Sequence, residues 1–119
     1  MDNTQEEIWA DIPGFPDYSV SNLGRVRSFR RTNDPDGVIM KPNWVGRDRQ
    51  YAQVQVFDGD GFRHNIYISR LVTLAFIDRR CTENVHYFDG DPMNVAADNL
   101  WFKRGPLIFS SSGVERADY

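Results

Sequence analysis

The chain has 119 residues, which is enough for one domain, or for two small lobes that share a core. Hydrophobic residues make up 40% of it and aromatic residues 13%, so the chain can fold without disulfide staples. The net charge of −3 argues against a uniformly basic nucleic-acid binder. A single cysteine, Cys81, excludes an intramolecular disulfide framework and indicates a reducing compartment. Its charged neighbours predict a surface thiol.

No stretch approaches the ~18 apolar residues of a membrane span, and the acidic N-terminus lacks the basic and apolar regions of a signal peptide. We therefore expect a cytoplasmic protein without a membrane partner.

Charge is distributed unevenly along the chain. The segment 20–49 carries seven arginine and lysine residues against three aspartates. Clustered basic side chains can face phosphates, although on charge alone an ordinary solvated surface fits equally well. The candidate nucleic-acid contacts are Arg25, Arg27, Arg30, Arg31, Lys41 and Arg47.

In chain order, residues 1–7 are polar and predicted to be flexible. The spacing of prolines and glycines after them predicts short strands, with a hairpin over residues 18–30 that turns at Asn22-Leu23-Gly24. Arg31–Gly37 is a polar loop, and residues 38–45 are predicted to form one short strand.

The clearest pattern is a second hairpin, because apolar and polar residues alternate over 51–57 and 62–68. A helix is predicted over 70–77, with Ser69 as its N-cap. Strands at 85–88 and 100–103 enclose a turn at 89–92. Gly105-Pro106 forbids helix continuation, and the tail after it is weakly ordered or adds one last strand.

Residues 85–91 read Val-His-Tyr-Phe-Asp-Gly-Asp and contain possible metal ligands. The imidazole of His86 and the carboxylate of Asp89 are groups that bind divalent cations. Asp-Gly-Asp is also the sequence of a plain turn, and the same triplet occurs at 58–60. Asn94 and Asn99 suit hydrogen bonding within a loop.

The order of these pieces resembles a known family. Residues 8–28 are similar to the module that precedes HNH homing endonucleases of phages and group I introns, which reads W-x-x-I-P-G-[FY] and then Y-x-V-S-N-x-G-R-V-[RK]-S. The matching residues are Trp9, Ile12, Pro13, Gly14, Phe15, Tyr18, Val20, Ser21, Asn22, Gly24, Arg25, Val26, Arg27 and Ser28. The later part resembles the HNH domain itself, with matches at Arg70-Leu71-Val72, Ala75-Phe76, Val85, Asp89-Gly90-Asp91, Asn94 and Asn99-Leu100.

This resemblance implies an α+β fold of short β-hairpins and one helix, with a ββα-metal finger in the C-terminal half. It divides the chain into an N-terminal module (8–45), an HNH-like domain (46–104) and a tail (105–119). In the family a metal-binding Asp or Asn precedes the histidine that activates water, a middle asparagine braces the loop, and a later helix supplies another ligand. The implied cofactor is Mg²⁺ or Mn²⁺, and the implied partner is double-stranded DNA.

The chain departs from the family at the positions that carry the chemistry. Tyr87 occupies the base position and His86 the preceding metal-ligand position, while Asn99 keeps the role of the bracing asparagine. A phenol, with a pKa of roughly 10, is a poor base at pH 7. His86 could take the base position only through a bulge, because adjacent strand residues face opposite sides. Ser69 replaces the usual histidine before Arg70, and Gly105-Pro106 removes or truncates the last helix.

These departures predict a catalytically impaired, HNH-like protein of phage type, located in the host cytoplasm, that still binds DNA through its basic residues and the hairpin at 51–68. One alternative is a protein-binding inhibitor or decoy that reuses the fold and offers Leu107-Ile108-Phe109 to a host protein. A second alternative is an active endonuclease that uses His86, with His86 and Asp89 as metal ligands.

Overall fold

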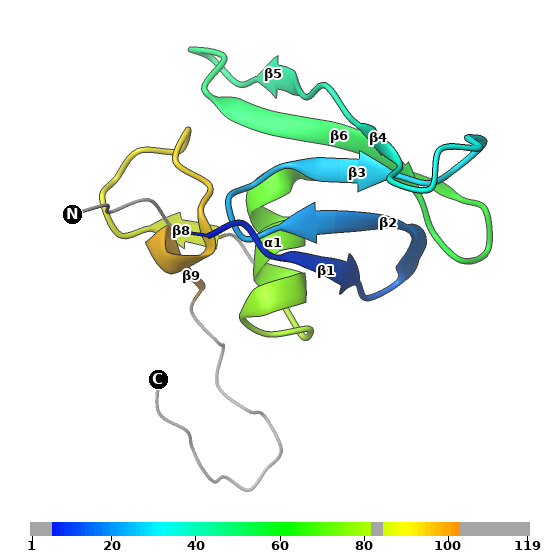
Figure 1. The fold of residues 1–119 in the computed structure, drawn as a ribbon. Coiled ribbons are helices and arrows are strands. Elements are labelled where there is room, and N and C mark those ends of the chain that lie inside the picture. The colour runs from blue at the N-terminus through cyan, green and yellow to red at the C-terminus, as the bar shows by residue number, and fades with distance from the viewer. Residues whose placement is uncertain (1–5, 82–84, 103–119) are drawn as a thin grey trace, which may run out of the picture.

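The computed structural model describes residues 6–81 and 85–102, which form three antiparallel sheets and one helix (Figure 1). The first sheet has the order β1-β2-β3-β4, the second the order β5-β6-β7, and the third pairs β8 with β9. The predicted α+β fold with one helix is therefore confirmed for these residues. The elements are β1 (Trp9–Ile12), β2 (Phe15–Ser21), β3 (Val26–Ser28), β4 (Val38–Ile39), β5 (Asn43–Val45), β6 (Tyr51–Phe57), β7 (Arg63–Tyr67), α1 (Ile68–Phe76), β8 (Val85–Tyr87), the 3₁₀ turn η1 (Ala97–Asn99) and β9 (Leu100–Phe102).

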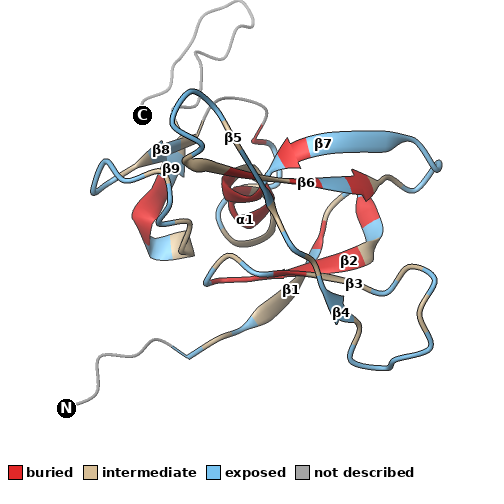
Figure 2. Ribbon diagram, turned by 90° about the horizontal axis from the view of Figure 1, so that it is seen from above, coloured by how far each residue is buried: buried red, intermediate tan, exposed pale blue. Residues whose placement is uncertain are grey.

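One hydrophobic core joins all three sheets to α1. Val20 of β2, Val56 of β6 and Leu71 of α1 are completely buried, and Leu100 of β9 belongs to the same cluster. Figure 2 shows the buried positions gathered around α1 and on the strands that face it. Burying each side chain of this size contributes about 1.5–3 kcal/mol. The core therefore contains residues from both sides of the domain boundary predicted at 45/46, and that boundary stays a prediction.

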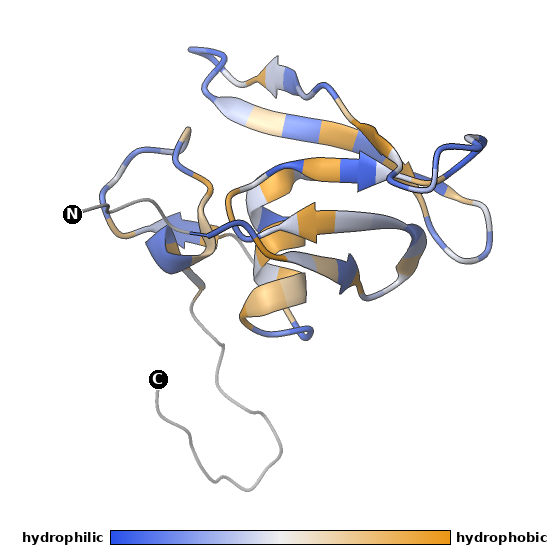
Figure 3. Ribbon diagram, in the orientation of Figure 1, coloured by the Kyte–Doolittle hydropathy of each residue, from blue (hydrophilic) through white to orange (hydrophobic). Residues whose placement is uncertain are grey.

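The hairpin at 51–67 follows its sequence pattern. Ala52, Val54 and Val56 are buried, and their polar neighbours face the other side of the sheet, as the alternating colours along β6 in Figure 3 show. A side-chain hydrogen bond links the first two sheets, because the Phe57 amide donates to the Tyr18 hydroxyl at 3.2 Å. The second sheet is thereby held in a defined position on the first.

The turn at Asn22–Gly24 is tied to the C-terminal part of the chain. Asn22 is buried, its side-chain oxygen accepts from the Ile8 amide at 2.7 Å, and its carbonyl accepts from the Ala97 amide at 2.7 Å. Gly24 has a φ of 96°, and a Cβ at this position would overlap the Val95 side chain. Glycine is therefore required both by the backbone conformation and by the close approach of the loop before η1.

The segment 38–45 was wrongly predicted as one strand. Val38 and Ile39 pair with β3, whereas Asn43–Val45 pair with β6 in a different sheet. Pro42 lies between the two short strands and has no N–H for a ladder, which explains why pairing cannot run continuously from one to the other.

Two further predictions were wrong because tertiary burial outweighs local sequence. The helix begins at Ile68, Tyr67 takes the N-cap position without a side-chain cap bond, and Ser69 lies buried inside the first turn. Cys81, predicted to be at the surface, is 1% exposed, and its amide donates to the Asp78 carbonyl at 3.1 Å in the turn after α1. That turn folds the chain back onto the core.

Residues 1–5 of the segment predicted to be flexible, and residues 103–119 with the predicted tail and the place of the finger's last helix, lie outside the described residues. Glu6 and Glu7 are described, and the Glu6 carbonyl accepts a hydrogen bond from the Asn22 side chain at 3.0 Å. No helix in the described part of the chain has the length and apolar character that a membrane span requires.

Candidate active site and nucleic-acid interface

The strands β8 and β9 form a two-stranded ribbon that carries the residues of the predicted catalytic motif. Its register is regular, with His86 opposite Trp101 and Tyr87 opposite Leu100. No bulge interrupts these pairs, so His86 and Tyr87 point to opposite faces of the ribbon. Tyr87 packs against the core, whereas His86 is exposed on the outer face.

Tyr87 lies half-buried against α1. Burial raises the pKa of its phenol above the ordinary value of 10.0, a hydrogen bond with the Ser69 side chain opposes this rise, and the neighbouring Tyr51 and Tyr67 phenols add to it. The phenol therefore stays protonated at neutral pH. A protonated phenol can donate a hydrogen bond, but it cannot take a proton from water.

His86 makes an aromatic contact on the outer face. Its ring stacks on Trp101 with 4.4 Å between the ring centroids and 22° between the ring planes. The Asp89 carboxylate lies in the following turn, where Oδ1 accepts from the Asp91 amide at 2.8 Å and Oδ2 accepts from the Asn94 side chain at 2.9 Å. These bonds, with that of Asn94 the strongest, lower the pKa of Asp89.

Asn99 connects the two ends of this turn. Its side-chain oxygen accepts from the Asp89 amide at 3.1 Å, and its side-chain nitrogen donates to Asp89 Oδ1 and to the Asn94 carbonyl, each at 2.9 Å. The residue is buried, with 7% of its surface exposed. Asn99 thus satisfies three groups of the loop at once, which is the geometry that a bracing role requires.

The first two basic candidates lie beside Trp9 on the outer face of the first sheet. Arg25 forms a two-pronged ion pair with Glu7, at 2.6 and 2.9 Å, and this hydrogen-bonded arginine lowers the pKa of Glu7 to about 2. The guanidinium of Arg27 lies 4.0 Å from the centre of the Trp9 ring. Part of the predicted positive patch is therefore already neutralised or stacked within the protein.

The other four basic candidates are distributed around the second sheet and the loops before it. Arg30 pairs with Asp17 at 3.3 Å and lies 4.1 Å from the centre of the Phe57 ring on β6. Arg31, Lys41 and Arg47 are exposed and form no salt bridge with another described residue. These three charges remain available to a phosphate.

The outer face of the second sheet carries a row of side-chain amides, which we call the amide face: Asn43, Gln53, Gln55 and Asn65. The register places Asn43 and Tyr67 on either side of Gln53, and Asn65 beside Gln55. The strands β5, β6 and β7 contain no aspartate or glutamate. The sequence predicted DNA contact through the hairpin at 51–68 but did not single out these amides, whose signal is the alternation of glutamines along β6.

Comparisons with known proteins show which proteins this chain is similar to. Residues 7–57 match the NUMOD4 motif. An uncharacterized HNH endonuclease of Acanthamoeba polyphaga mimivirus is 32% identical over 101 residues, which are 81% of this chain and 23% of that protein. A solved structure that describes DNA binding and cleavage by the HNH homing endonuclease I-HmuI superposes on this chain with a TM-score of 0.61. The sequence identity is 29%, and the match covers 78% of this chain and 50% of the I-HmuI chain. The chain belongs to an HNH endonuclease-like family. It spans about a quarter of the curated relative and half of I-HmuI.

Within this HNH-like chain, two departures from the family motif contact each other. The resemblance aligns Tyr87 with the base position and Ser69 with the histidine position of the helix, and the side chains of these two residues are hydrogen-bonded. HNH endonucleases are generally metal-dependent, but the described residues contain no group of three His, Cys, Asp or Glu side chains that could hold a metal ion. The His86 ring is stacked on Trp101 and the Asp89 carboxylate is hydrogen-bonded within its turn, and the assignment of these two side chains as metal ligands stays a prediction.

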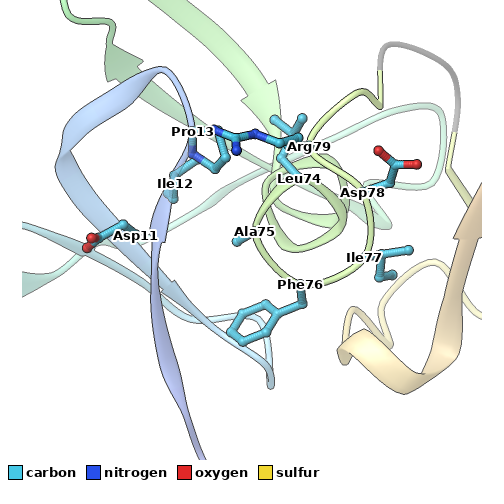
Figure 4. A pocket seen from close by; sticks show the side chains of 9 residues that line it. All are labelled: Asp11, Ile12, Pro13, Leu74, Ala75, Phe76, Ile77, Asp78 and Arg79. Carbon is cyan, nitrogen blue, oxygen red and sulfur yellow. The ribbon is translucent and has the colours of Figure 1, made fainter.

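A shallow groove of about 450 Å³ lies away from the ribbon, between β1 and the end of α1 (Figure 4). Its lining combines apolar side chains with three charged ones and exposes polar and apolar surface equally: Asp11, Ile12, Pro13, Leu74, Ala75, Phe76, Ile77, Asp78 and Arg79. None of the catalytic, metal-binding or nucleic-acid-binding candidates lines it. The groove is therefore separate from both candidate sites of the HNH-like fold.

Proposed function

We propose that this HNH-like chain binds double-stranded DNA and is catalytically impaired. The observation that carries the catalytic impairment is the state of Tyr87. Its side chain is half-buried and hydrogen-bonded to Ser69, and burial raises the pKa of its phenol. A general base must accept a proton at the operating pH and lie within hydrogen-bond reach of the water. Tyr87 fails the first condition, and His86 faces the opposite side of the ribbon.

Loss of the general base also reduces what the metal ligands can contribute to the rate of cleavage. Catalytic groups that work as a unit are strongly non-additive, so removing the base and one metal ligand together leaves little of the rate. The side chains of this ribbon have other contacts: Tyr87 stabilises the packing on α1, and Asp89 and Asn99 stabilise the turn. These contacts give the residues of the ribbon a structural role that does not depend on catalysis.

The DNA-binding part of the proposal is supported by the amide face and the charges around it. Carboxamides of Asn and Gln can bond to base edges, above all to adenine, and the major groove admits a β-ribbon. Exposed Arg31, Lys41 and Arg47 can contact phosphates, which position a protein on the duplex. The likeness to I-HmuI also supports DNA as the partner.

A salt titration with matched variants tests the binding. Arg47→Ala should reduce the salt dependence of duplex affinity by about one phosphate contact, whereas the Gln53→Ala/Gln55→Ala double variant should reduce discrimination between sequences by about 1–3 kcal/mol and leave the salt slope unchanged. Arg80→Ala is the control, because Arg80 is exposed but paired with Asp78 at the far end of α1. Affinity that stays flat between low and moderate salt would refute a phosphate interface.

A nicking assay tests the catalytic impairment. We expect no nicking of supercoiled plasmid with Mg²⁺ or Mn²⁺, and no difference between the wild-type protein and His86→Ala. If the wild-type protein nicks and His86→Ala does not, the chain is an active endonuclease that uses His86, and the impairment is disproved.

One observation favours protein binding as a second function. Strand β1 is at the edge of its sheet and borders the groove, whose lining includes Leu74 and Phe76, and Glu6 and Asp11 are exposed. An edge strand beside a groove suits an added strand of another polypeptide, whose apolar side chains would fill the groove and whose basic side chains would meet the carboxylates. Ala75→Arg should abolish capture of such a host protein, and Val38→Ala, at an exposed position on β4 that does not line the groove, should not. Capture that instead requires residues 105–119 would assign the binding to the tail.

A further inference from the structure

Three rings lie together on the outer face of the β8–β9 ribbon, and we call them the ribbon's aromatic surface: His86, Phe88 and Trp101. Trp101 contacts both of the others, with 4.4 Å between its ring and that of His86 and 6.2 Å to that of Phe88. Phe88 is 69% exposed and Trp101 39%. The opposite face of the ribbon, with Tyr87 and Leu100, already supplies its contact with the core. Core packing therefore does not explain these rings.

Backbone pairing fixes the positions from which the three rings project. His86 and Trp101 are directly opposite in the ladder, and the Phe88 amide continues it by donating to the Asn99 carbonyl at 2.8 Å. Phe88 therefore stays beside Trp101 although it follows the last residue of β8. A surface of preset rings binds a flat partner at a lower entropic cost than mobile side chains would.

The charges next to the rings indicate whether this surface would contact a phosphate or a base of a nucleic acid. The turn that follows Phe88 contains the carboxylates of Asp89 and Asp91, which are bonded to groups of the same turn. Negative charge at this position repels a phosphate, whereas a base offers a neutral π-face that stacks on aromatic rings. Base stacking is thus favoured here over contact with the backbone.

We propose that the ribbon's aromatic surface stacks an unpaired nucleobase of the bound DNA, at a single-stranded overhang or a gap. The proposal rests on the DNA binding proposed above and assigns to that complex a second contact, at a different face from the amide face. Phe88 provides the open ring, Trp101 supports it, and the exposed imidazole of His86 offers a hydrogen bond to the base edge. In this arrangement His86 takes part in binding.

The test compares two forms of one labelled duplex, one with blunt ends and one with a short single-stranded overhang, by fluorescence anisotropy on the full chain. Stacking of one base on an aromatic side chain changes affinity by about fivefold to 150-fold. The wild-type protein should bind the overhang form more tightly by a factor in this range. Trp101→Ala and Phe88→Ala should remove that preference and leave the blunt-duplex affinity unchanged.

Two controls keep the outcome interpretable. Val38→Ala also truncates an apolar side chain that is about half exposed, 51%, but lies on β4, so it should keep the preference. Trp101→Phe retains a ring and should keep most of the preference. This variant therefore tests the surface even where Trp101→Ala disturbs folding. Circular dichroism checks the fold of each variant.

The failures can be told apart. Equal affinity of the wild-type protein for both duplex forms, with blunt binding intact, overturns this inference and leaves the proposed function standing. Absence of binding to either form removes both. Self-association that Trp101→Ala abolishes would assign the surface to contact between copies of the chain, and that result also overturns the inference.

Discussion

Replacing Asn99 by alanine should destabilise the protein by about 2–3 kcal/mol. The side chain makes three hydrogen bonds, to the Asp89 amide, to Asp89 Oδ1 and to the Asn94 carbonyl, and it is buried. Each such bond contributes about 1 kcal/mol net, and an unsatisfied buried partner costs more. Asp89 is exposed, so water can replace the bond to its carboxylate, and the estimate stays below the sum for three fully buried bonds.

Urea unfolding followed by circular dichroism measures this loss. With a slope of about 1–3 kcal/mol per molar urea, the midpoint should shift by about 1 M or more. Asn94→Ala is the matched control, because Asn94 is exposed and its side chain bonds to exposed Asp89 at 2.9 Å and to the Ala96 amide at 3.4 Å. It should cost less than about 1 kcal/mol. Equal losses in both variants, or a loss below about 0.5 kcal/mol for Asn99→Ala, would refute the reasoning that Asn99 braces the turn.

Three other predictions concern stability. The folded pKa of Glu7, about 2, is below its ordinary value of 4.5, so its contribution is complete above pH 4.5 and is lost as pH falls towards 2. Wild-type stability should therefore fall more over this range than that of Glu7→Gln, while at pH 7 the variant should lose about 1 kcal/mol or less, because Arg25 is half-exposed. Leu71→Ala, at a fully buried position, should lower the free energy of unfolding by about 2–5 kcal/mol, and a loss below about 1 would contradict the core described above. Gly24→Ala combines a strained φ with overlap on Val95 and should shift the urea midpoint more than Gly61→Ala, where φ is also positive but no atom lies within 4 Å.

Features that depend on neighbouring residues in the chain could be predicted from the sequence. The alternation from Tyr51 to Phe57 predicts both the strand and its buried face, and the Asn22-Leu23-Gly24 turn predicts the β2–β3 hairpin. The sequence also predicted the two strands that pair as β8 and β9, and the opposite orientation of His86 and Tyr87 follows from the period of a strand. Each of these inferences needs only local geometry or a known motif.

Features that depend on distant residues could not be predicted. Ser69 has the chemistry of an N-cap, but Ile68 just before it must enter the core, so the helix starts earlier. Arg25 was counted as free charge because its partner, Glu7, lies 18 residues away. The stacking of His86 required knowledge of which residue of β9 stands opposite it, and that register is set by the packing of the whole ribbon.

The tie between the Asn22–Gly24 turn and the loop at Val95–Ala97 limits how such a protein can be reassembled by recombination. The Ala97 amide needs the Asn22 carbonyl, and the space that Val95 occupies exists because residue 24 has no side chain. An N-terminal segment taken from another protein would have to bring the same asparagine and glycine at the same turn. Residues 20–26 and the loop at Val95–Ala97 thus fit each other as a matched pair, and we expect an exchange that mismatches them to destabilise the fold before it affects DNA binding.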